Sequence, residues 1–162
     1  MKIATWNVNS MKVRLPHVME WMQANEPDVL VLQEIKQVTE AFPAAELLEA
    51  GYQSLSNGQK TYNGVAVISK TAPADPVLEF PGFDDPQRRV LATTIDGVRV
   101  VNLYIPNGSE VGSEKYDYKL RWLATLRDFL EDEMSRHDDL VVLGDFNIAP
   151  ADEDVYDAEK WG

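Results

Sequence analysis

Val29-Leu30-Val31-Leu32 is a short apolar run of alternating β-branched valine and leucine that leads directly into the polar pair Gln33-Glu34. Two other runs share this pattern: Ile3-Ala4-Thr5-Trp6 leads into Asn7, and Leu140-Val141-Val142-Leu143 leads into Gly144-Asp145-Phe146-Asn147. Such runs are typical of central strands that are covered on both faces. Polar groups just beyond the carboxyl ends of such strands gather in one crevice. The sequence therefore predicts a shared polar site at these strand ends.

Helix and strand signals alternate along the rest of the chain. Ser10 can cap a helix over residues 10–25, and Gly51 can close a short helix over residues 43–50. Asp96-Gly97 is a strong hairpin signal, and residues 117–134 carry an apolar stripe at helical spacing. These signals predict one α/β domain with a mixed sheet. Its other strands are expected at residues 52–56, 64–69, 89–95, 98–105 and 139–145.

The composition limits the classes of protein that the chain can represent. Its 162 residues are enough for one domain with a hydrophobic core. Cysteine is absent, which excludes disulfides, a thiol nucleophile and cysteine-based zinc sites. The first residues turn polar too early for a secretory leader, and no apolar stretch has the length of a membrane span. We therefore expect a cytoplasmic protein without a membrane partner.

The net charge of −12 argues against a nucleic-acid partner, because phosphate binding normally depends on Lys and Arg. The acidic excess is uneven, however, since Arg136 and Lys160 are the only basic residues from Asp128 onward. Net charge governs steering and solubility more than what one cleft binds. A local positive surface is still expected from basic residues earlier in the chain: Lys12, Arg14, Lys36, Lys60, Lys70, Arg88 and Arg89.

The polar residues at the strand ends predict metal-assisted phosphate chemistry. One Glu, one Asp and two Asn side chains supply hard oxygen ligands, which suit magnesium rather than zinc. The Asp145 carboxylate could orient or deprotonate water, and the Asn147 amide could donate to a developing oxyanion. Alternatively, these two residues form a turn in which they bond their own backbone. Glu34 by itself could equally be a solvent-facing carboxylate. Gln33 could orient a ligand or satisfy backbone groups, and the second is expected.

Other candidate residues leave two interpretations open. Tyr104 ends a strand before Pro106-Asn107-Gly108, so its phenol could contact a phosphate oxygen or only pack in the core. Tyr62, on a loop, could stack on a ligand or pack against the surface. His17 and His137 are expected on a helix and just past a helix end, away from the strand ends. No histidine is therefore predicted to act as a general base.

Taken in order, several short motifs resemble one enzyme class. They are similar to the exonuclease III class of apurinic/apyrimidinic endonucleases, within the endonuclease/exonuclease/phosphatase superfamily. The resemblance runs over nearly the whole chain, and the Leu-Gln-Glu-x-Lys run distinguishes it from the lipid phosphatases and sphingomyelinases of that superfamily. The motifs are Trp6-Asn7-Val8-Asn9-Ser10, Leu32-Gln33-Glu34-Ile35-Lys36, Asn63-Gly64-Val65-Ala66, Gln87-Arg88-Arg89, Tyr104-Ile105-Pro106-Asn107-Gly108 and Gly144-Asp145-Phe146-Asn147-Ile148-Ala149-Pro150.

The resemblance implies a fold and an activity. The fold would be the N-terminal part of a DNase I-like four-layer α/β sandwich, with two mixed sheets flanked by helices. The activity would be hydrolysis of the phosphodiester 5′ to abasic sites in double-stranded DNA, and it allows 3′–5′ exonuclease and 3′-phosphodiesterase activity at 3′ ends. The cofactor would be Mg²⁺, with Mn²⁺ as an alternative ion.

The resemblance also implies roles for single residues. Glu34 and Asn7 would belong to the metal site, and catalysis would involve Tyr104 as a phosphate contact, Asp145 as the water-activating carboxylate and Asn147 as the oxyanion-stabilising amide. Lys12, Tyr62, Arg89 and Asn107 match positions that contact the DNA backbone. Ser109-Glu110 stands where some relatives carry an Arg, which puts one DNA contact in doubt.

The chain departs from the class at its C-terminal end. Members continue to an Asp in a later strand and to a terminal Ser-Asp-His that supplies the catalytic histidine, and these motifs are not in this sequence. Residues 149–162 are polar and acidic. We therefore expect a single domain over residues 1–162 that is incomplete at its C-terminus, and that self-associates for this reason. The alternatives are a non-catalytic fragment that retains part of a metal or DNA surface, and another phosphodiesterase or phosphatase of the superfamily.

Overall fold

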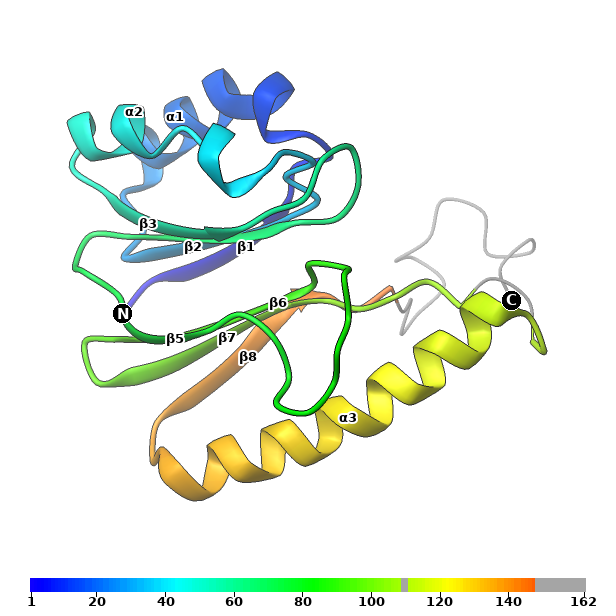
Figure 1. The fold of residues 1–162 in the computed structure, drawn as a ribbon. Coiled ribbons are helices and arrows are strands. Elements are labelled where there is room, and N and C mark those ends of the chain that lie inside the picture. The colour runs from blue at the N-terminus through cyan, green and yellow to red at the C-terminus, as the bar shows by residue number, and fades with distance from the viewer. Residues whose placement is uncertain (109–110, 148–162) are drawn as a thin grey trace, which may run out of the picture.

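The computed structural model describes residues 1–108 and 111–147, which form four stacked layers (Figure 1). Two sheets lie face to face in the middle, and helices cover the outer face of each sheet. This two-sheet arrangement agrees with the fold that the resemblance implies. Ser109-Glu110 and residues 148–162 lie outside the described ranges, so the expectations placed on them are not addressed by the structure.

Sheet A is built from the first part of the chain. Its strand order is β1-β2-β4-β3, with β1 and β2 parallel and the other pairs antiparallel. Helices α1 and α2 lie over its outer face (Figure 1). The elements are β1 (Ile3–Asn7), α1 (Met11–Asn25), β2 (Val29–Gln33), the 3₁₀ turn η1 (Thr39–Ala41), α2 (Ala44–Glu49), β3 (Gln53–Asn57) and β4 (Val65–Ser69).

Sheet B follows in the sequence and packs against sheet A. Its strand order is β5-β6-β7-β8, with β7 and β8 parallel and the other pairs antiparallel. The long helix α3 runs beneath its outer face (Figure 1). The elements are β5 (Ala74–Val77), β6 (Val90–Ile95), β7 (Val98–Tyr104), α3 (Glu114–Arg136) and β8 (Leu140–Asp145).

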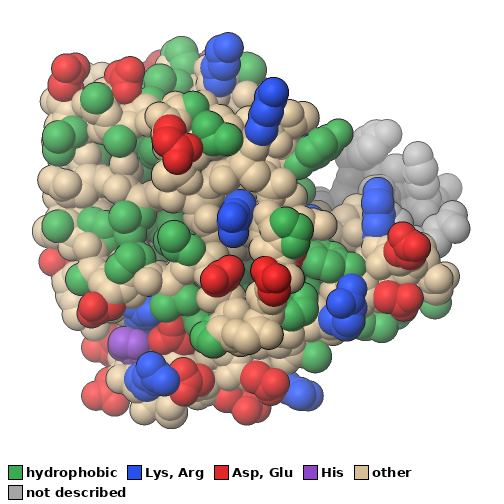
Figure 2. Space-filling view, in the orientation of Figure 1, with side chains coloured by type: hydrophobic (Ala, Val, Ile, Leu, Met, Phe, Trp, Pro, Cys, Tyr) green, Lys and Arg blue, Asp and Glu red, His purple; other side chains and the backbone are tan. Residues whose placement is uncertain are grey.

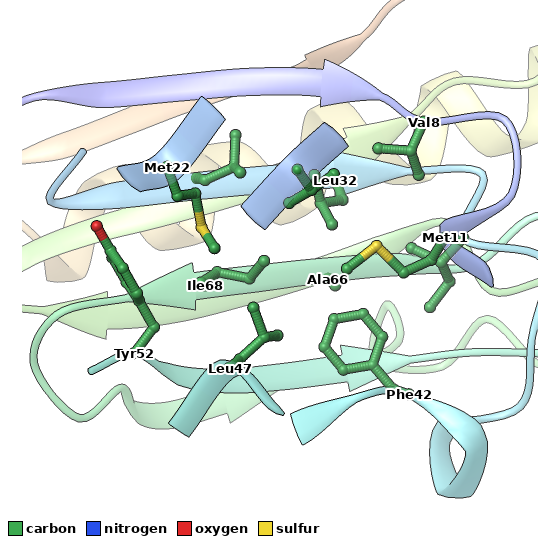
Figure 3. Packing of buried hydrophobic residues seen from close by; sticks show 12 residues of the cluster. Val8, Met11, Met22, Leu32, Phe42, Leu47, Tyr52, Ala66 and Ile68 are labelled. Carbon is green, nitrogen blue, oxygen red and sulfur yellow. The ribbon is translucent and has the colours of Figure 1, made fainter. Parts of the chain in front are cut away.

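Each interface between layers has its own apolar core. Beneath α1 and α2, side chains such as Met22, Leu47 and Ile68 pack on the outer face of sheet A (Figure 3). Valines of β2 and β4 fill the space between the sheets, together with Leu91 and Ile95 of β6. A third cluster, which includes buried Trp122, Leu126 and Phe129, joins α3 to sheet B. Area buried in this way is the main favourable contribution to folding.

The helix ends follow from local hydrogen bonding. The Ser10 hydroxyl accepts from the backbone N–H of Val13 at 3.4 Å and caps α1, as the sequence predicted. Ser113 caps α3 in the same way through the N–H of Tyr116 at 3.1 Å, so α3 begins three residues earlier than the pattern suggested. None of the helices in the described ranges is long and apolar enough to cross a membrane.

Two expectations about the sheets were wrong, and one strand was missed. The signals predicted one mixed sheet, but the strands divide into two. Of the three apolar runs, only β2 is a fully buried central strand; within the described residues β1 and β8 lie at sheet edges and are partly exposed. The short strand β5 was not predicted, because Ala74-Asp75-Pro76-Val77 has no apolar alternation and contains a proline, which edge strands tolerate.

Candidate active site

Four predicted site residues come together where strands of both sheets end. Asn7 is the last residue of β1, and Glu34 directly follows β2. Tyr104 and Asp145 are the last residues of β7 and β8, and they are paired in the register of sheet B. Because β1 runs parallel to β2 and β7 runs parallel to β8, these ends lie at the same side of the stacked sheets (Figure 1).

The Asn7 amide joins the two carboxylates of the site. Its Nδ2 donates to Glu34 Oε2 at 2.6 Å and to Asp145 Oδ2 at 2.7 Å. Two residues of sheet A are thereby linked to one residue of sheet B. The two carboxylates lie no farther apart than the sum of these two distances, so their negative charges repel each other across a short gap. A cation between them would relieve that repulsion.

The backbone turns sharply after β2 and brings a lysine back to the site. Glu34 and Lys36 both have left-handed φ angles, of 55° and 57°. Through this turn, and not through a continued strand, Lys36 Nζ comes to lie 3.9 Å from Glu34 Oε1. It also donates to Asn9 Oδ1. One positive charge therefore stands beside the carboxylate pair.

Tyr104 lies under an arginine at the edge of the inter-sheet core. The Arg89 guanidinium carbon is 4.8 Å from the centre of the Tyr104 ring, and Arg89 also donates to the Tyr104 carbonyl at 3.1 Å. Burial, followed by the charge of Glu34, raises the pKa of Tyr104 to about 12, although Arg89 opposes this shift. The phenol therefore keeps its proton at neutral pH and can donate a hydrogen bond.

Asp145 and Asn147 adopt the turn that the sequence left open as an alternative. Asp145 Oδ1 accepts the backbone N–H of Asn147 at 3.0 Å, and Asn147 has a left-handed φ of 50°. The Asn147 side chain donates to the Ile105 carbonyl. Asn147 thus lies next to the site, but its side-chain nitrogen donates to a backbone carbonyl and not to the carboxylates.

The residues expected to contact DNA are spread around these strand ends. Lys12 and Asn107 are exposed, and Tyr62 has 67% of its surface exposed. The loop that carries Tyr62 is tied to the site, because the Asn63 carbonyl accepts the N–H of Lys36 at 3.0 Å. On the face drawn in Figure 2, Lys and Arg side chains are interspersed with Asp and Glu and form no continuous basic surface.

The histidines lie away from the site, as the sequence predicted. His17 is on α1. His137 follows the C-terminal end of α3, where its Nε2 lies 3.1 Å from Glu133 Oε2. Neither histidine is at the ends of β1, β2, β7 and β8, so within the described residues the carboxylates are the candidate bases.

Sequence reasoning missed some residues that support the site. Gln33 does not satisfy the backbone as expected; its Nε2 donates to Thr5 Oγ1 and to Asn102 Oδ1, both at 2.9 Å. Tyr118 donates to Asp85, and the centre of its ring lies 5.8 Å from the Arg89 guanidinium carbon. One signal was available for Asn102, because it is a polar amide inside the apolar run of β7.

The donor set agrees with magnesium, which is often held by one or two carboxylates together with water and substrate phosphate. Glu34 and Asp145 supply the carboxylate oxygens. Asn7 turns its nitrogen toward them, while its Oδ1 accepts the N–H of Asn9 at 3.1 Å. The described residues contain no group of three or more His, Asp or Glu side chains placed to hold a metal. Asn7 as a ligand stays a prediction.

Comparisons with known proteins agree with the fold and the motifs. A model of the Endonuclease/Exonuclease/phosphatase family matches residues 4–162. Among curated proteins, exodeoxyribonuclease III of Haemophilus influenzae is 34% identical over 162 residues, which cover 96% of this chain and 60% of that protein.

Solved structures resemble the chain over nearly its whole length. The 3′-5′ exonuclease NExo from Neisseria meningitidis has a TM-score of 0.95 and 55% identity, over 100% of this chain and 64% of that one. The 3′ phosphatase NExo from Neisseria, bound to a product DNA hairpin, matches with the same score and identity and is covered to 63%. An AP endonuclease from Archaeoglobus fulgidus has a TM-score of 0.91 and 38% identity, over 99% of this chain and 62% of that one. The chain thus spans between 60% and 64% of the length of these relatives.

Proposed function

Because this chain belongs to the Endonuclease/Exonuclease/phosphatase family, we propose that it carries the phosphate-cleaving strand ends of a DNA repair nuclease of the exonuclease III class. The observation that carries the proposal is the Asn7 amide, which holds the Glu34 and Asp145 carboxylates together beside the Tyr104 phenol. This cluster joins the ends of strands from both sheets. The cluster offers negative charge that can hold a metal ion, a carboxylate that can activate water and a phenol that can donate to a phosphate oxygen.

The proposed reaction is hydrolysis of the phosphodiester 5′ to an abasic site in double-stranded DNA. We include 3′–5′ exonuclease and 3′-phosphodiesterase activity, since each of these reactions is attack by water on a phosphate of DNA. The relatives support this substrate class, because they are described as an exodeoxyribonuclease, a 3′-5′ exonuclease and an AP endonuclease. Lys12, Tyr62, Arg89 and Asn107 are proposed to contact the DNA backbone.

The chain's own residues have distinct proposed roles. Asp145, the last residue of β8, accepts a proton from the attacking water or orients it. Tyr104, which keeps its proton, donates to a phosphate oxygen. Asn147 donates to the developing charge, which requires its amide nitrogen to leave the Ile105 carbonyl.

Glu34, with Asp145, would hold Mg²⁺ or Mn²⁺, and Asn7 would hold the two carboxylates in place. When bound, the ion stabilises the negative charge that develops on the phosphate. Lys36 lies beside Glu34 and adds a fixed positive charge on the same side of the site.

The test is the substitution Asp145→Asn in the complete gene product. We expect kcat on an abasic duplex to fall by about 10²–10⁴-fold, because a group that transfers a proton in the transition state is worth that much. Binding of the duplex should be nearly unchanged. Asp139→Asn is the matched control, since Asp139 is an exposed aspartate just before the opposite end of β8. Its kcat should equal that of the wild type.

Two results would contradict the proposal. An Asp145→Asn variant that retains most of its kcat would assign Asp145 to structure. A wild-type protein that cleaves an inositol phosphate and leaves the abasic duplex intact would assign the chain to another branch of the family.

A further inference from the structure

We propose that Asn102 and Gln33 are positioning residues that fix sheet A against sheet B directly beneath the site. Together with Thr5 they form an inter-sheet pin, a chain of side-chain hydrogen bonds between the two layers. Its effect on cleavage rests on the proposed nuclease function, but its effect on the geometry of the site does not.

The pin is a short network that crosses from one sheet to the other. Asn102, on β7 of sheet B, donates from Nδ2 to the carbonyls of Leu32 at 3.0 Å and Ala66 at 2.9 Å, both in sheet A. Its Oδ1 accepts from Gln33 Nε2 at 2.9 Å. The same nitrogen of Gln33 donates to Thr5 Oγ1 on β1. Strands β1, β2 and β4 are thereby all linked to β7.

The burial of these amides makes their contacts specific. Asn102 is 0% exposed and Gln33 is 1% exposed, beside a layer that is filled mainly with valine. A buried amide without partners is costly, so each relative position of the sheets that breaks these bonds is disfavoured. Purely apolar contacts are not directional and would tolerate small shifts. The pin therefore selects one alignment of the two sheets.

The position of the pin couples this alignment to the site. Gln33 directly precedes Glu34 and is paired with Asn7 in sheet A. Asn102 lies two residues before Tyr104, and residues at this spacing in a strand share a face. Both Asn102 and Tyr104 therefore point toward sheet A, and Tyr104 packs against the inter-sheet core. A shift between the sheets would move Glu34 away from Tyr104 and stretch the bond from Asn7 to Asp145.

The chain offers a matched control for a role in stability alone. Asn57, on β3, also joins the sheets through a buried amide, which donates to the carbonyls of Leu78 at 2.7 Å and Val90 at 2.9 Å. It is 5% exposed, but it lies on the strand at the opposite edge of sheet A from β1. Losing its bonds should destabilise the fold without misaligning Glu34 and Tyr104.

The experiment compares Asn102→Ser with Asn57→Ser in the complete gene product, at a temperature where both are folded. We expect both to lower the unfolding midpoint. Only Asn102→Ser should lower kcat on an abasic duplex, with KM nearly unchanged. The expected decrease is about 10²-fold, because a misplacement of roughly 1 Å at a catalytic site can cost that much. Thr5→Val, at an exposed position, removes one bond and should lower kcat by less. If Asn102→Ser does not fold, Thr5→Val is compared with Asn57→Ser in its place.

A second readout does not require nuclease activity. Hydrogen–deuterium exchange of the backbone amides reports how tightly the two sheets are held together. Asn102→Ser should speed exchange at the ends of β2 and β7 beside the site, because a looser contact between the sheets admits water, whereas Asn57→Ser should speed exchange along β3 instead. Equal effects of the two variants on kcat and on this exchange pattern would overturn the proposal. A wild type that does not cleave DNA would overturn the proposed function only, and the exchange pattern would still decide the role of the pin.

Discussion

The Asn7 amide donates to two carboxylates at the site, so removing one carboxylate changes the hydrogen bonding of the other. Replacing Glu34 with alanine removes one set of oxygen donors and leaves Asn7 bound to Asp145 alone. We expect the affinity for Mn²⁺ or Mg²⁺ to fall by at least the roughly tenfold that is typical for losing even an outer-sphere partner. Isothermal titration calorimetry measures this directly. Glu40→Ala, an exposed glutamate on η1, is the control, and equal affinities in both variants would exclude Glu34 as a ligand.

The raised pKa of Tyr104 predicts that the protein loses stability at high pH. Its pKa is raised to about 12 in the folded protein, mainly by burial, whereas an unfolded chain releases the same proton near pH 10. Between these values the folded state binds more protons than the unfolded state. Its free energy of unfolding must therefore fall as the pH rises through this window, and the contribution is fully present below pH 10.

Denaturation of wild type and Tyr104→Phe at a series of pH values isolates this effect. The free energy of unfolding of the wild type minus that of Tyr104→Phe should be constant below pH 10. Above pH 10 this difference should decrease, because only the wild type loses stability there. A difference that stays constant up to pH 12 would mean that Tyr104 titrates normally in the folded state.

At the scale of elements, a buried ion pair joins α3 to sheet B. Arg99 of β7 lies 3.0 Å from Glu133 of α3, and both side chains are at most 5% exposed. Glu133→Gln leaves Arg99 without its counter-charge, and we expect a loss of about 3–5 kcal/mol in the free energy of unfolding. Urea denaturation measures it. Asp132→Asn is the control in the same helix, because its pair with Arg136 is exposed and should contribute at most about 1 kcal/mol.

A double variant separates the cost of an unpaired buried Arg99 charge from the contribution of the ion pair itself. Arg99→Met combined with Glu133→Leu removes both charges, so it should be more stable than Glu133→Gln alone. If Glu133→Gln were no more harmful than Asp132→Asn, the buried pair would contribute nothing to the docking of α3.

The elements also show what the sequence could and could not predict. Apolar runs located all the described strands but β5, and capping residues and an apolar stripe located the α-helices, because these signals are local in the sequence. Which strands share a sheet is decided by contacts between distant residues, and the wrong single-sheet prediction follows from this. The same limit applies to the site. Glu34 and Asp145 were found from their positions after apolar runs, whereas the partner of Gln33 could not be found without the packing of β7 on β2.

At the scale of the whole molecule, two neighbouring strands have open edges. Within the described residues, β1 pairs with β2 alone and β8 pairs with β7 alone, and β1 and β8 lie against each other. Apolar side chains such as Trp6 and Leu143 are only partly buried there. Unpaired strand edges are templates for further pairing. We propose that these two edges are where a further strand would pair, whether it comes from a second copy of the chain or from an added fragment.

This proposal predicts the behaviour of residues 1–162 produced alone. We expect self-association, and near-inactivity on an abasic duplex with magnesium, because neither histidine lies at the site. Light scattering over a series of concentrations measures the mass, and the assay is repeated after adding the C-terminal part of a longer relative. A monomer at every concentration that cleaves as fast as a full-length relative would contradict both expectations.

The hydrogen bond from Asn7 to Asp145 joins residues that are 138 positions apart. The four described strands of sheet A have all been synthesised once Ser69 has left the ribosome, but Asp145, the acceptor in this bond, is synthesised much later. Closing so long a loop has a large entropic cost, which only the docking of sheet B can offset. During synthesis, Asn7 and Glu34 therefore cannot meet Asp145 until β8 has been made, so we expect the carboxylate pair to assemble late in folding.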